Sequence, residues 1–134
     1  MTAVAPQGAA YVFTCSGSPC TWTQKQELTA ADGASRDEFG TRVAVSGNTI
    51  MIGNNSSRGA AYVFTCSGTP CTWTQQQELT AADGARGDEF GYSVAMSGNT
   101  AIIGAAYKNS YQGAAYMFNS PAVAITRSPT PPAP

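Results

Sequence analysis

Residues 37–64 read DEFGTRVAVSGNTIMIGNNSSRGAAYVF, and this stretch decides the fold class because it predicts three consecutive β-strands. Residues 41–46 and 48–52 are short runs rich in β-branched residues, joined by a Gly-Asn pair. Such a pair can adopt the positive φ angles that a tight hairpin needs. Residues 60–65 form a third run and residues 72–80 a fourth. No stretch has a sustained apolar period of about 3.6 residues, so the sequence predicts an all-β chain.

The same pattern recurs along the chain. Residues 8–53 align without a gap with residues 59–104; nine of these 46 positions differ, which leaves 37 identical. Gly-Ala-Ala-Tyr returns once more at residue 113, which gives repeat units 8–58 and 59–112 and a partial unit 113–118. A period near 50 residues is typical of a four-stranded propeller blade. The second and third runs are apolar on both faces, as expected for a sheet packed between two others, whereas the fourth alternates like an edge strand.

Two short motifs connect this pattern to a known family. Phe39-Gly40 and Phe90-Gly91 are each followed by Val-Ala, then Ser-Gly-Asn-Thr, and then Gly-Ala-Ala-Tyr, and this order closely resembles the FG-GAP repeat. The resemblance covers roughly residues 8–118 and implies an integrin-α-like β-propeller of the kind found mostly in extracellular and surface proteins.

Counting strands, we expect about two and a quarter four-stranded antiparallel blades: the last two strands of one blade, four of the next and three of another. A closed propeller takes about 4–8 blades, so the chain is expected to be a partial propeller. A fragment of a longer repeat protein is favoured over an oligomer that closes a ring, because nine strands would leave one strand spare.

Composition argues against several classes of function. The chain has 134 residues, a net charge of −1 and seven scattered basic residues, which argues against nucleic acid as a partner. No apolar run approaches the roughly 18 residues of a membrane helix, so membrane insertion is not expected. Histidine is absent, and with it the commonest general base and zinc ligand. The sequence therefore predicts no catalytic residue and no cofactor.

Metal binding is not expected either. Integrin-type repeats often carry a carboxylate-rich calcium loop between the second and third strands of a blade. The corresponding residues here, 53–59 and 104–113, contain no carboxylate, which a hard cation requires.

Four cysteines lie in two equivalent pairs, Cys15 with Cys20 and Cys66 with Cys71, at the turns between the third and fourth strands. Four intervening residues in a hairpin allow a local bridge. Local disulfides are favoured over free thiols or a shared metal site, since the spacing is not that of zinc modules. Disulfides indicate an oxidising compartment. We therefore expect an extracellular or cell-surface protein, although residues 1–7 do not resemble a signal peptide.

All eight acidic residues fall within residues 27–38 and 78–89, the connections from one unit to the next. Solvated turns are the simplest interpretation. The alternative is an acidic rim that binds a cation or a basic partner, made of Asp32, Asp37, Glu38, Asp83, Asp88 and Glu89. Arg86-Gly87-Asp88 is the tripeptide that many integrins recognise, but the first unit has Ser-Arg-Asp there, which favours coincidence.

The aromatic residues on the strands, Trp22 and Trp73 among them, favour packing over a carbohydrate platform because they stand at alternating positions. Residues 119–134 carry five prolines and predict a linker or tail. Together these features predict a non-catalytic repeat module for extracellular binding, adhesion or architecture, with an unknown protein or carbohydrate ligand. The alternatives are an accessory propeller of a secreted enzyme and a lectin-like carbohydrate binder. Uncovered blade faces also predict self-association.

Overall fold

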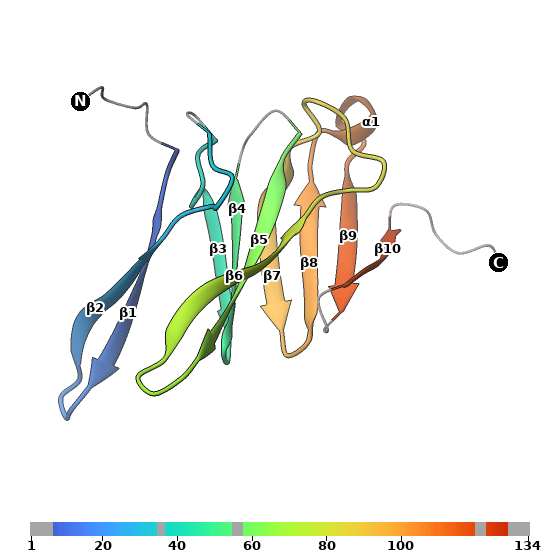
Figure 1. The fold of residues 1–134 in the computed structure, drawn as a ribbon. Coiled ribbons are helices and arrows are strands. Elements are labelled where there is room, and N and C mark those ends of the chain that lie inside the picture. Colours follow the sequence, from blue (N-terminus) through green and yellow to red (C-terminus); the bar gives the residue numbers. More distant parts are fainter. Residues whose placement is uncertain (1–6, 35–36, 55–57, 120–122, 129–134) are drawn as a thin grey trace, which may run out of the picture.

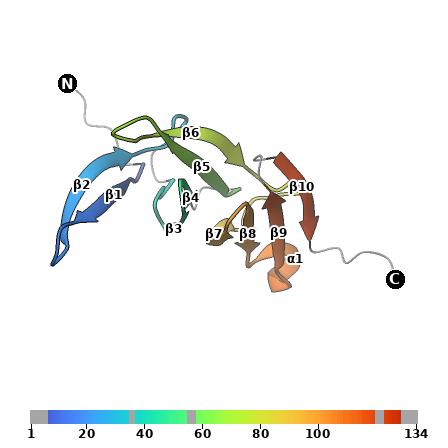
Figure 2. The ribbon, with the colours of Figure 1, turned by 90° about the horizontal axis from the view of Figure 1, so that it is seen from below.

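The computed structural model describes residues 7–34, 37–54, 58–119 and 123–128, the last of these as backbone only. It is an antiparallel all-β structure of three sheets that follow one another along the chain and stand side by side (Figures 1 and 2). Within each sheet, every strand pairs with its neighbour in sequence.

The first sheet, here called the half-sheet, contains β1 (Ala10–Ser16) and β2 (Thr21–Leu28). The middle sheet contains β3 (Arg42–Ser46), β4 (Thr49–Asn54), β5 (Ala60–Ser67) and β6 (Thr72–Leu79). The last sheet contains β7 (Phe90–Ser97), β8 (Thr100–Ala105), β9 (Ala114–Asn119) and β10 (Val123–Ser128). A single turn, α1 (Lys108–Tyr111), lies between β8 and β9.

The expected strands of the middle sheet all form, with ends within two residues of their predicted positions. Of the residues of β4 and β5, Ile50 to Asn54 and Ala60 to Phe64 are buried, as expected for strands covered on both faces. In β6 the side chains alternate between half-buried and exposed, which is typical of an edge strand.

The expected strand count was wrong in one place, because part of the proline-containing segment 119–134 forms β10. Val123–Ser128 pairs antiparallel with β9, with Arg127 opposite Tyr116. Its Val-Ala-Ile-Thr sequence suits a strand, and pairing satisfies backbone groups along the outer edge of β9. The last sheet therefore has four strands instead of three. Residues 129–134 of the predicted tail lie outside the described residues.

The core consists of two layers between the three sheets. One layer, between the half-sheet and the middle sheet, includes Leu28, Phe39, Ile52 and Phe64. The other, between the middle and last sheets, includes Met51, Val63, Leu79, Phe90 and Ile103. Burial of apolar side chains between sheets, at about 25 cal/mol for each Å² removed from water, is the main attraction that holds the sheets together.

The joints between successive sheets are made by the Phe-Gly motifs. Phe39 forms a parallel bridge with Gly8, just before β1, and Phe90 forms one with Gly59, just before β5, so each motif pairs with a residue of the preceding sheet. The Phe90 ring packs edge-on against Tyr116 and Phe118 of its own sheet, at centroid distances of 5.4 and 6.3 Å. Phe39 and Phe90 thus each belong to one of the two core layers between sheets.

The two glycines of these motifs permit the close approach. A Cβ on Gly91 would lie 2.6 Å from the carbonyl oxygen of Ala60 and 3.1 Å from that of Asn54. Gly40 stands in the same position against the Ala9 carbonyl, and both glycines have positive φ angles near +100°. Backbone therefore packs directly on backbone at each joint, which only glycine allows.

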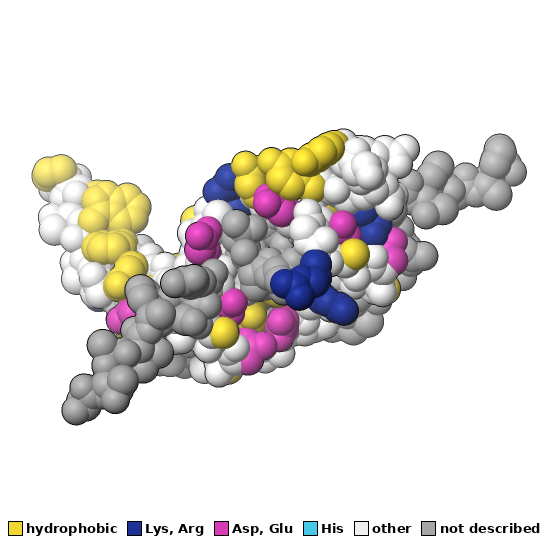
Figure 3. Space-filling model, turned by 90° about the horizontal axis from the view of Figure 1, so that it is seen from above, with side chains coloured by type: hydrophobic (Ala, Val, Ile, Leu, Met, Phe, Trp, Pro, Cys, Tyr) yellow, Lys and Arg dark blue, Asp and Glu magenta, His cyan; other side chains and the backbone are white. Residues whose placement is uncertain are grey.

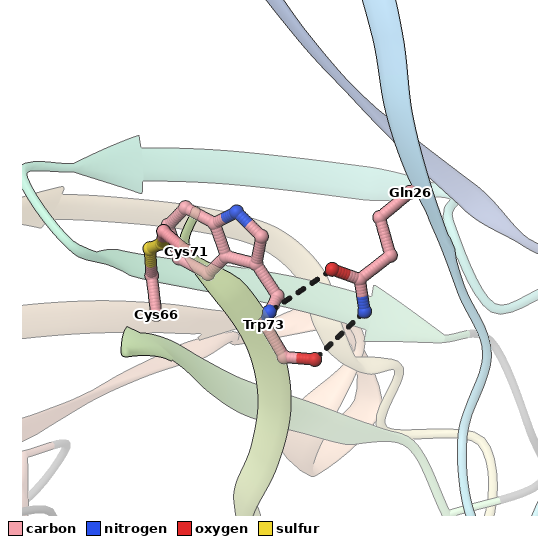
Figure 4. The surroundings of a disulfide bond; sticks show 4 residues. All are labelled: Gln26, Cys66, Cys71 and Trp73. Atoms are coloured by element: carbon pink, nitrogen blue, oxygen red, sulfur yellow. Dashed lines mark hydrogen bonds between the residues drawn. A yellow bond between two sulfur atoms is a disulfide. The ribbon is translucent and has the colours of Figure 1, made fainter. Parts of the chain in front are cut away.

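A second link joins the outer strands of neighbouring sheets. The Gln26 side-chain amide, on β2, donates to the Trp73 carbonyl at 2.8 Å and accepts from the Trp73 N–H at 3.0 Å (Figure 4). The Gln26 side chain thus links β2 to β6 with the same pair of hydrogen bonds that a neighbouring backbone would make. It also satisfies backbone groups that an edge strand would otherwise leave to solvent.

Candidate functional site

The two ends of the sheets differ in what they carry. One end, called the turn end, carries the tight hairpin turns (Figure 1). The opposite end, called the loop end, carries the connections between sheets, the loops between the second and third strands, and α1 (Figure 1). Loops held by a rigid scaffold often carry binding residues, so a binding site is expected at the loop end.

The cysteines lie at the turn end. The structure joins Cys15 to Cys20 and Cys66 to Cys71, with Cα–Cα distances of 5.4 and 5.5 Å. Each bridge closes a turn between two paired strands, and the Cys66–Cys71 bridge lies beside Trp73 (Figure 4). The disulfides therefore brace the hairpins and stand apart from the loop end.

The acidic residues do lie at the loop end, but the structure uses several of them internally. The Tyr62 hydroxyl donates to Asp32 at 3.0 Å, and the Tyr116 hydroxyl donates to Asp83 at 2.8 Å. Asp37 and Asp88 each accept the backbone N–H of the residue three positions earlier. Glu38 and Glu89, with φ angles of 57° and 60°, turn the chain into the Phe-Gly motifs.

Lys108 gives the second connection a basic partner. Its side chain is 8% exposed, and its Nζ lies 3.4 Å from carboxylate oxygens of both Asp83 and Asp88. The same Nζ donates to the Asp83 carbonyl at 2.8 Å. Burial alone would raise the pKa of Asp83, but the hydrogen bonds from Tyr116 and Lys108 hold that pKa below its usual value. Lys108 thus anchors the loop before β9 onto the connection that precedes β7.

The equivalent place in the middle sheet is more acidic. Glu78 stands opposite Tyr62 across the β5–β6 pair, and the Tyr62 hydroxyl lies 3.5 Å from its carboxylate. Burial, together with a hydrogen bond to Asp32, raises the pKa of Glu78. Burial and the neighbouring carboxylates likewise raise the pKa of Tyr62. No group of three or more His, Cys, Asp or Glu among the described residues is placed to hold a metal ion.

The Arg-Gly-Asp tripeptide does not present its carboxylate. Asp88 is 8% exposed, and its side chain bonds the Ala85 N–H at 3.0 Å in addition to its contact with Lys108. Arg86 and Gly87 are exposed, but the third residue points inward. Display of the tripeptide to a receptor would require the connection to rearrange.

A feature that the sequence interpretation missed is a cluster of aromatic side chains at the loop end. Tyr92 and Tyr107 stack with centroids 6.3 Å apart, and Tyr107 meets Tyr111 edge-on at 5.0 Å. The Arg42 guanidinium lies 4.7 Å from the centre of the Tyr92 ring. These four residues are called the tyrosine cluster. Tyr92 is 38% exposed, Tyr107 44% and Tyr111 77%. Hydrophobic side chains gather on this face beside charged ones (Figure 3).

The tyrosine cluster comes from positions at which the two nearly identical units differ. Tyr92 replaces the Thr41 of the first unit, and Arg42 is replaced by Ser93 in the second. Tyr107 and Tyr111 lie in the loop that is three residues longer than its counterpart. Asn109, Ser110 and Tyr111 have φ angles of 54°, 55° and 73°, a conformation that side chains rarely adopt. The unequal loops and the pair of unmatched positions were the signal in the sequence that could have identified this site.

A family model described as the FG-GAP repeat matches residues 22–64 and 73–118, which is more than half of the chain. The chain belongs to the FG-GAP repeat family. Each FG-GAP match begins in the last strand of one sheet, β2 or β6, and continues through one Phe-Gly motif into the first three strands of the next sheet. No curated protein and no solved structure matches the chain. Within the ranges that the structure describes, no helix is long and apolar enough to span a membrane.

Proposed function

We propose that this FG-GAP chain is a non-catalytic binding module of the extracellular space, that its sheets are blades of a β-propeller, and that it contacts a protein partner through the tyrosine cluster. The observation that carries the proposal is the convergence of unmatched residues from two near-identical units on one exposed surface. The scaffold repeats, whereas the tyrosine cluster does not. Because the tyrosine cluster uses positions at which the two units differ, its residues are not needed for the repeated fold and are better explained by binding.

The chemistry of the tyrosine cluster favours a protein over a sugar. Tyrosine and arginine are the residues that most often carry the binding energy of protein interfaces. A sugar platform needs a free aromatic face, but Arg42 covers one face of Tyr92 and Tyr107 stacks on the ring. Apart from the exposed ring of Tyr111, the cluster offers ring edges, hydroxyl groups and an arginine already held in place. Preorganised side chains lose less conformational entropy on binding.

Several observations support the remaining parts of the proposal. The two disulfides are the kind of bond that persists in an oxidising compartment. The carboxylates of Asp32, Asp83 and Asp88 are engaged with tyrosines, Lys108 or backbone amides, an arrangement that suits a structural role better than acid–base chemistry. Successive sheets joined at their Phe-Gly motifs are the arrangement that propeller blades require.

The test is binding of the labelled chain to the surface and secreted proteins of its source organism, measured for three proteins. The first is the wild type, the second carries Tyr107→Ala and Tyr111→Ala, and the third carries Trp22→Ala. Trp22 is a matched control because it is 67% exposed but lies on the half-sheet, away from the loop end. We expect the double variant to bind about tenfold or more weakly and the control to bind normally.

Two results would oppose the proposal. Equal loss in the control and the double variant would show that binding does not use the tyrosine cluster. Binding of the wild type to an array of glycans, abolished by the double variant, would show that the ligand is a carbohydrate.

A further inference from the structure

Between the middle sheet and the last sheet, at the turn end, lies a cavity of about 230 Å³, here called the turn-end cavity. Both sheets that bound it have four strands. Its apolar side chains are buried or half-buried and form its floor: Met51, Val63, Leu79, Met96, Ala101 and Phe118. Its polar side chains are half-buried or exposed and lie at its mouth: Thr49, Thr65, Gln76, Asn99, Thr100 and Asn119. No charged side chain is among the described residues that line it.

Three of the nine positions at which the two units differ line the turn-end cavity. Ala101 stands where the first unit has Ile50, and the loss of most of that side chain makes room between the sheets. Gln76 stands where the first unit has a lysine, which leaves the lining uncharged. Met96 stands where the first unit has a valine, and a flexible thioether side chain adapts to the shape of a guest.

The corresponding place between the half-sheet and the middle sheet contains an indole ring. Trp73 packs there against the first core layer, beside Val12, Leu28 and Ile50. The residues one unit later than these three line the turn-end cavity, and they are Val63, Leu79 and Ala101. The last sheet has no tryptophan, because the two of the chain are Trp22 and Trp73. The same wall therefore accepts an indole at the first joint and receives none from the chain at the second.

We propose that the turn-end cavity binds a small uncharged molecule with a two-ring aromatic system of indole size and an N–H or O–H donor. An apolar cavity of about 150 Å³ holds a benzene ring, and about 230 Å³ is roughly one and a half times that volume. Met51, Met96 and Phe118 offer sulfur and ring contacts that favour an aromatic guest. The donor of the ligand meets side-chain oxygens at the mouth, such as those of Thr65 and Asn99.

The mouth of the turn-end cavity suits a free molecule better than a side chain of a partner protein. Thr65 and Gln76 belong to the middle sheet, and Asn99 and Asn119 face them from the last sheet. Polar groups of a ligand that enters whole are met from both sheets. A tryptophan of a partner would have to pass its backbone between these side chains. The turn-end cavity also stands apart from the tyrosine cluster at the loop end, so the two sites can be occupied together.

The experiment titrates the whole chain with indole and follows the methyl signals of its methionines by NMR after labelling with ¹³C. Met51 and Met96 line the turn-end cavity and report binding there. Met117 is 42% exposed and does not line the cavity, so its signal is an internal control. Two further compounds are titrated into the wild type. Indole-3-acetate carries a negative charge, and N-acetyltryptophan amide imitates the side chain of a partner protein.

Two variants each give the second unit a residue of the first. Ala101→Ile fills the turn-end cavity with the side chain that Ile50 places at the equivalent position, so this variant should fold. Ile102→Met changes the next position, which is 44% exposed and does not line the cavity, and it is the matched control. The Met117 signal reports that each variant is folded, and the three titrations of the wild type do not depend on either variant.

We expect indole to shift the Met51 and Met96 signals saturably, with a dissociation constant on the order of 0.1–1 mM, and to leave Met117 unchanged. Ala101→Ile should weaken binding about tenfold or more because its side chain occupies the space of the ring, and Ile102→Met should bind normally. Indole-3-acetate should bind about tenfold or more weakly because no cation in the lining offsets the burial of its charge. N-acetyltryptophan amide should also bind more weakly than indole.

Several results would overturn the proposal. Absence of a saturable shift at Met51 and Met96, or unchanged binding by Ala101→Ile, would show that the turn-end cavity is not the site. Equal binding of indole-3-acetate would show that the ligand need not be uncharged. Tighter binding of N-acetyltryptophan amide than of indole would show that the cavity receives a tryptophan of a partner protein instead of a free molecule.

Discussion

Replacement of Gly91 by alanine tests whether the joint between sheets depends on backbone packing. The new Cβ would lie 2.6 Å from the Ala60 carbonyl oxygen, a distance that real Cβ atoms do not tolerate, and the residue would keep a φ of +94°. The matched control is Gly98→Ala, in the turn between β7 and β8, where φ is +57° and no atom lies within 4 Å. The two changes share a positive φ and differ in the steric clash.

The expected magnitudes follow from these two terms. A left-handed alanine costs roughly 1–2 kcal/mol, and this is the whole expected loss for Gly98→Ala. Overpacking adds about 1–3 kcal/mol, so Gly91→Ala should lower the free energy of unfolding by about 2–5 kcal/mol. Urea denaturation followed by tryptophan fluorescence measures both losses. With a slope of about 1–3 kcal/mol/M, an excess of about 2 kcal/mol moves the midpoint by roughly 1 M.

Equal midpoints for the two variants would refute the reasoning. They would show that the sheets can separate slightly at the joint without loss of stability. The tight approach of Gly91 to Ala60 would then be a consequence of the fold and not a condition for it.

Three further predictions concern charge and covalent links. Lys108→Met should lower the free energy of unfolding, measured by urea denaturation, by about 1–3 kcal/mol, which is less than the loss of a fully buried ion pair because Asp83 is 42% exposed. Addition of Asp88→Asn should restore part of this loss, and a Lys108→Met variant as stable as the wild type would contradict the anchoring role. The folded-state pKa of Asp83 is lowered, so the stability that this carboxylate contributes is present above the ordinary pKa of 3.8 and is lost as the pH falls. The folded-state pKa of Glu78 is raised, so the stability that its protonated form contributes is present below the ordinary pKa of 4.5 and is lost as the pH rises. Asp83→Asn should therefore weaken the acid dependence of the unfolding midpoint and Glu78→Gln should weaken the decline above pH 4.5, and unchanged profiles would refute both assignments. Replacement of Cys66 and Cys71 by serine should cost about 2 kcal/mol, as expected for a loop with a sequence separation of 5, and complete unfolding would show that the bridge does more than brace one hairpin.

The sequence was sufficient for the repeated part of the fold. Strand positions and the burial of β4 and β5 follow from local patterns that occur twice, so each unit supports the interpretation of the other. β10 was missed because proline-containing composition outweighed a short β-branched run. That run becomes a strand because β9 offers it an unpaired edge.

The candidate site was harder to predict because it depends on distances that no local pattern contains. Arg42 and Tyr92 come from different units, and Tyr107 comes from a loop that is not matched in length. The acidic residues were recognised as a group, yet the buried Asp88 contacts Lys108, which lies 20 positions away in sequence. Interactions of this kind become visible only when the sheets are placed side by side.

The joints described above also bear on how such a molecule can change over generations. Gly8 with Phe39 and Gly59 with Phe90 make the same backbone contact, and neither contact requires a particular side chain from the loops. Duplication of the gene segment that encodes one unit of 51 residues would therefore supply both the glycine and the phenylalanine of a new joint at once. Loops can then diverge freely at one end of the molecule while the turns and bridges at the other remain constant. Lengthening the array and altering what it recognises are, in this architecture, separate events.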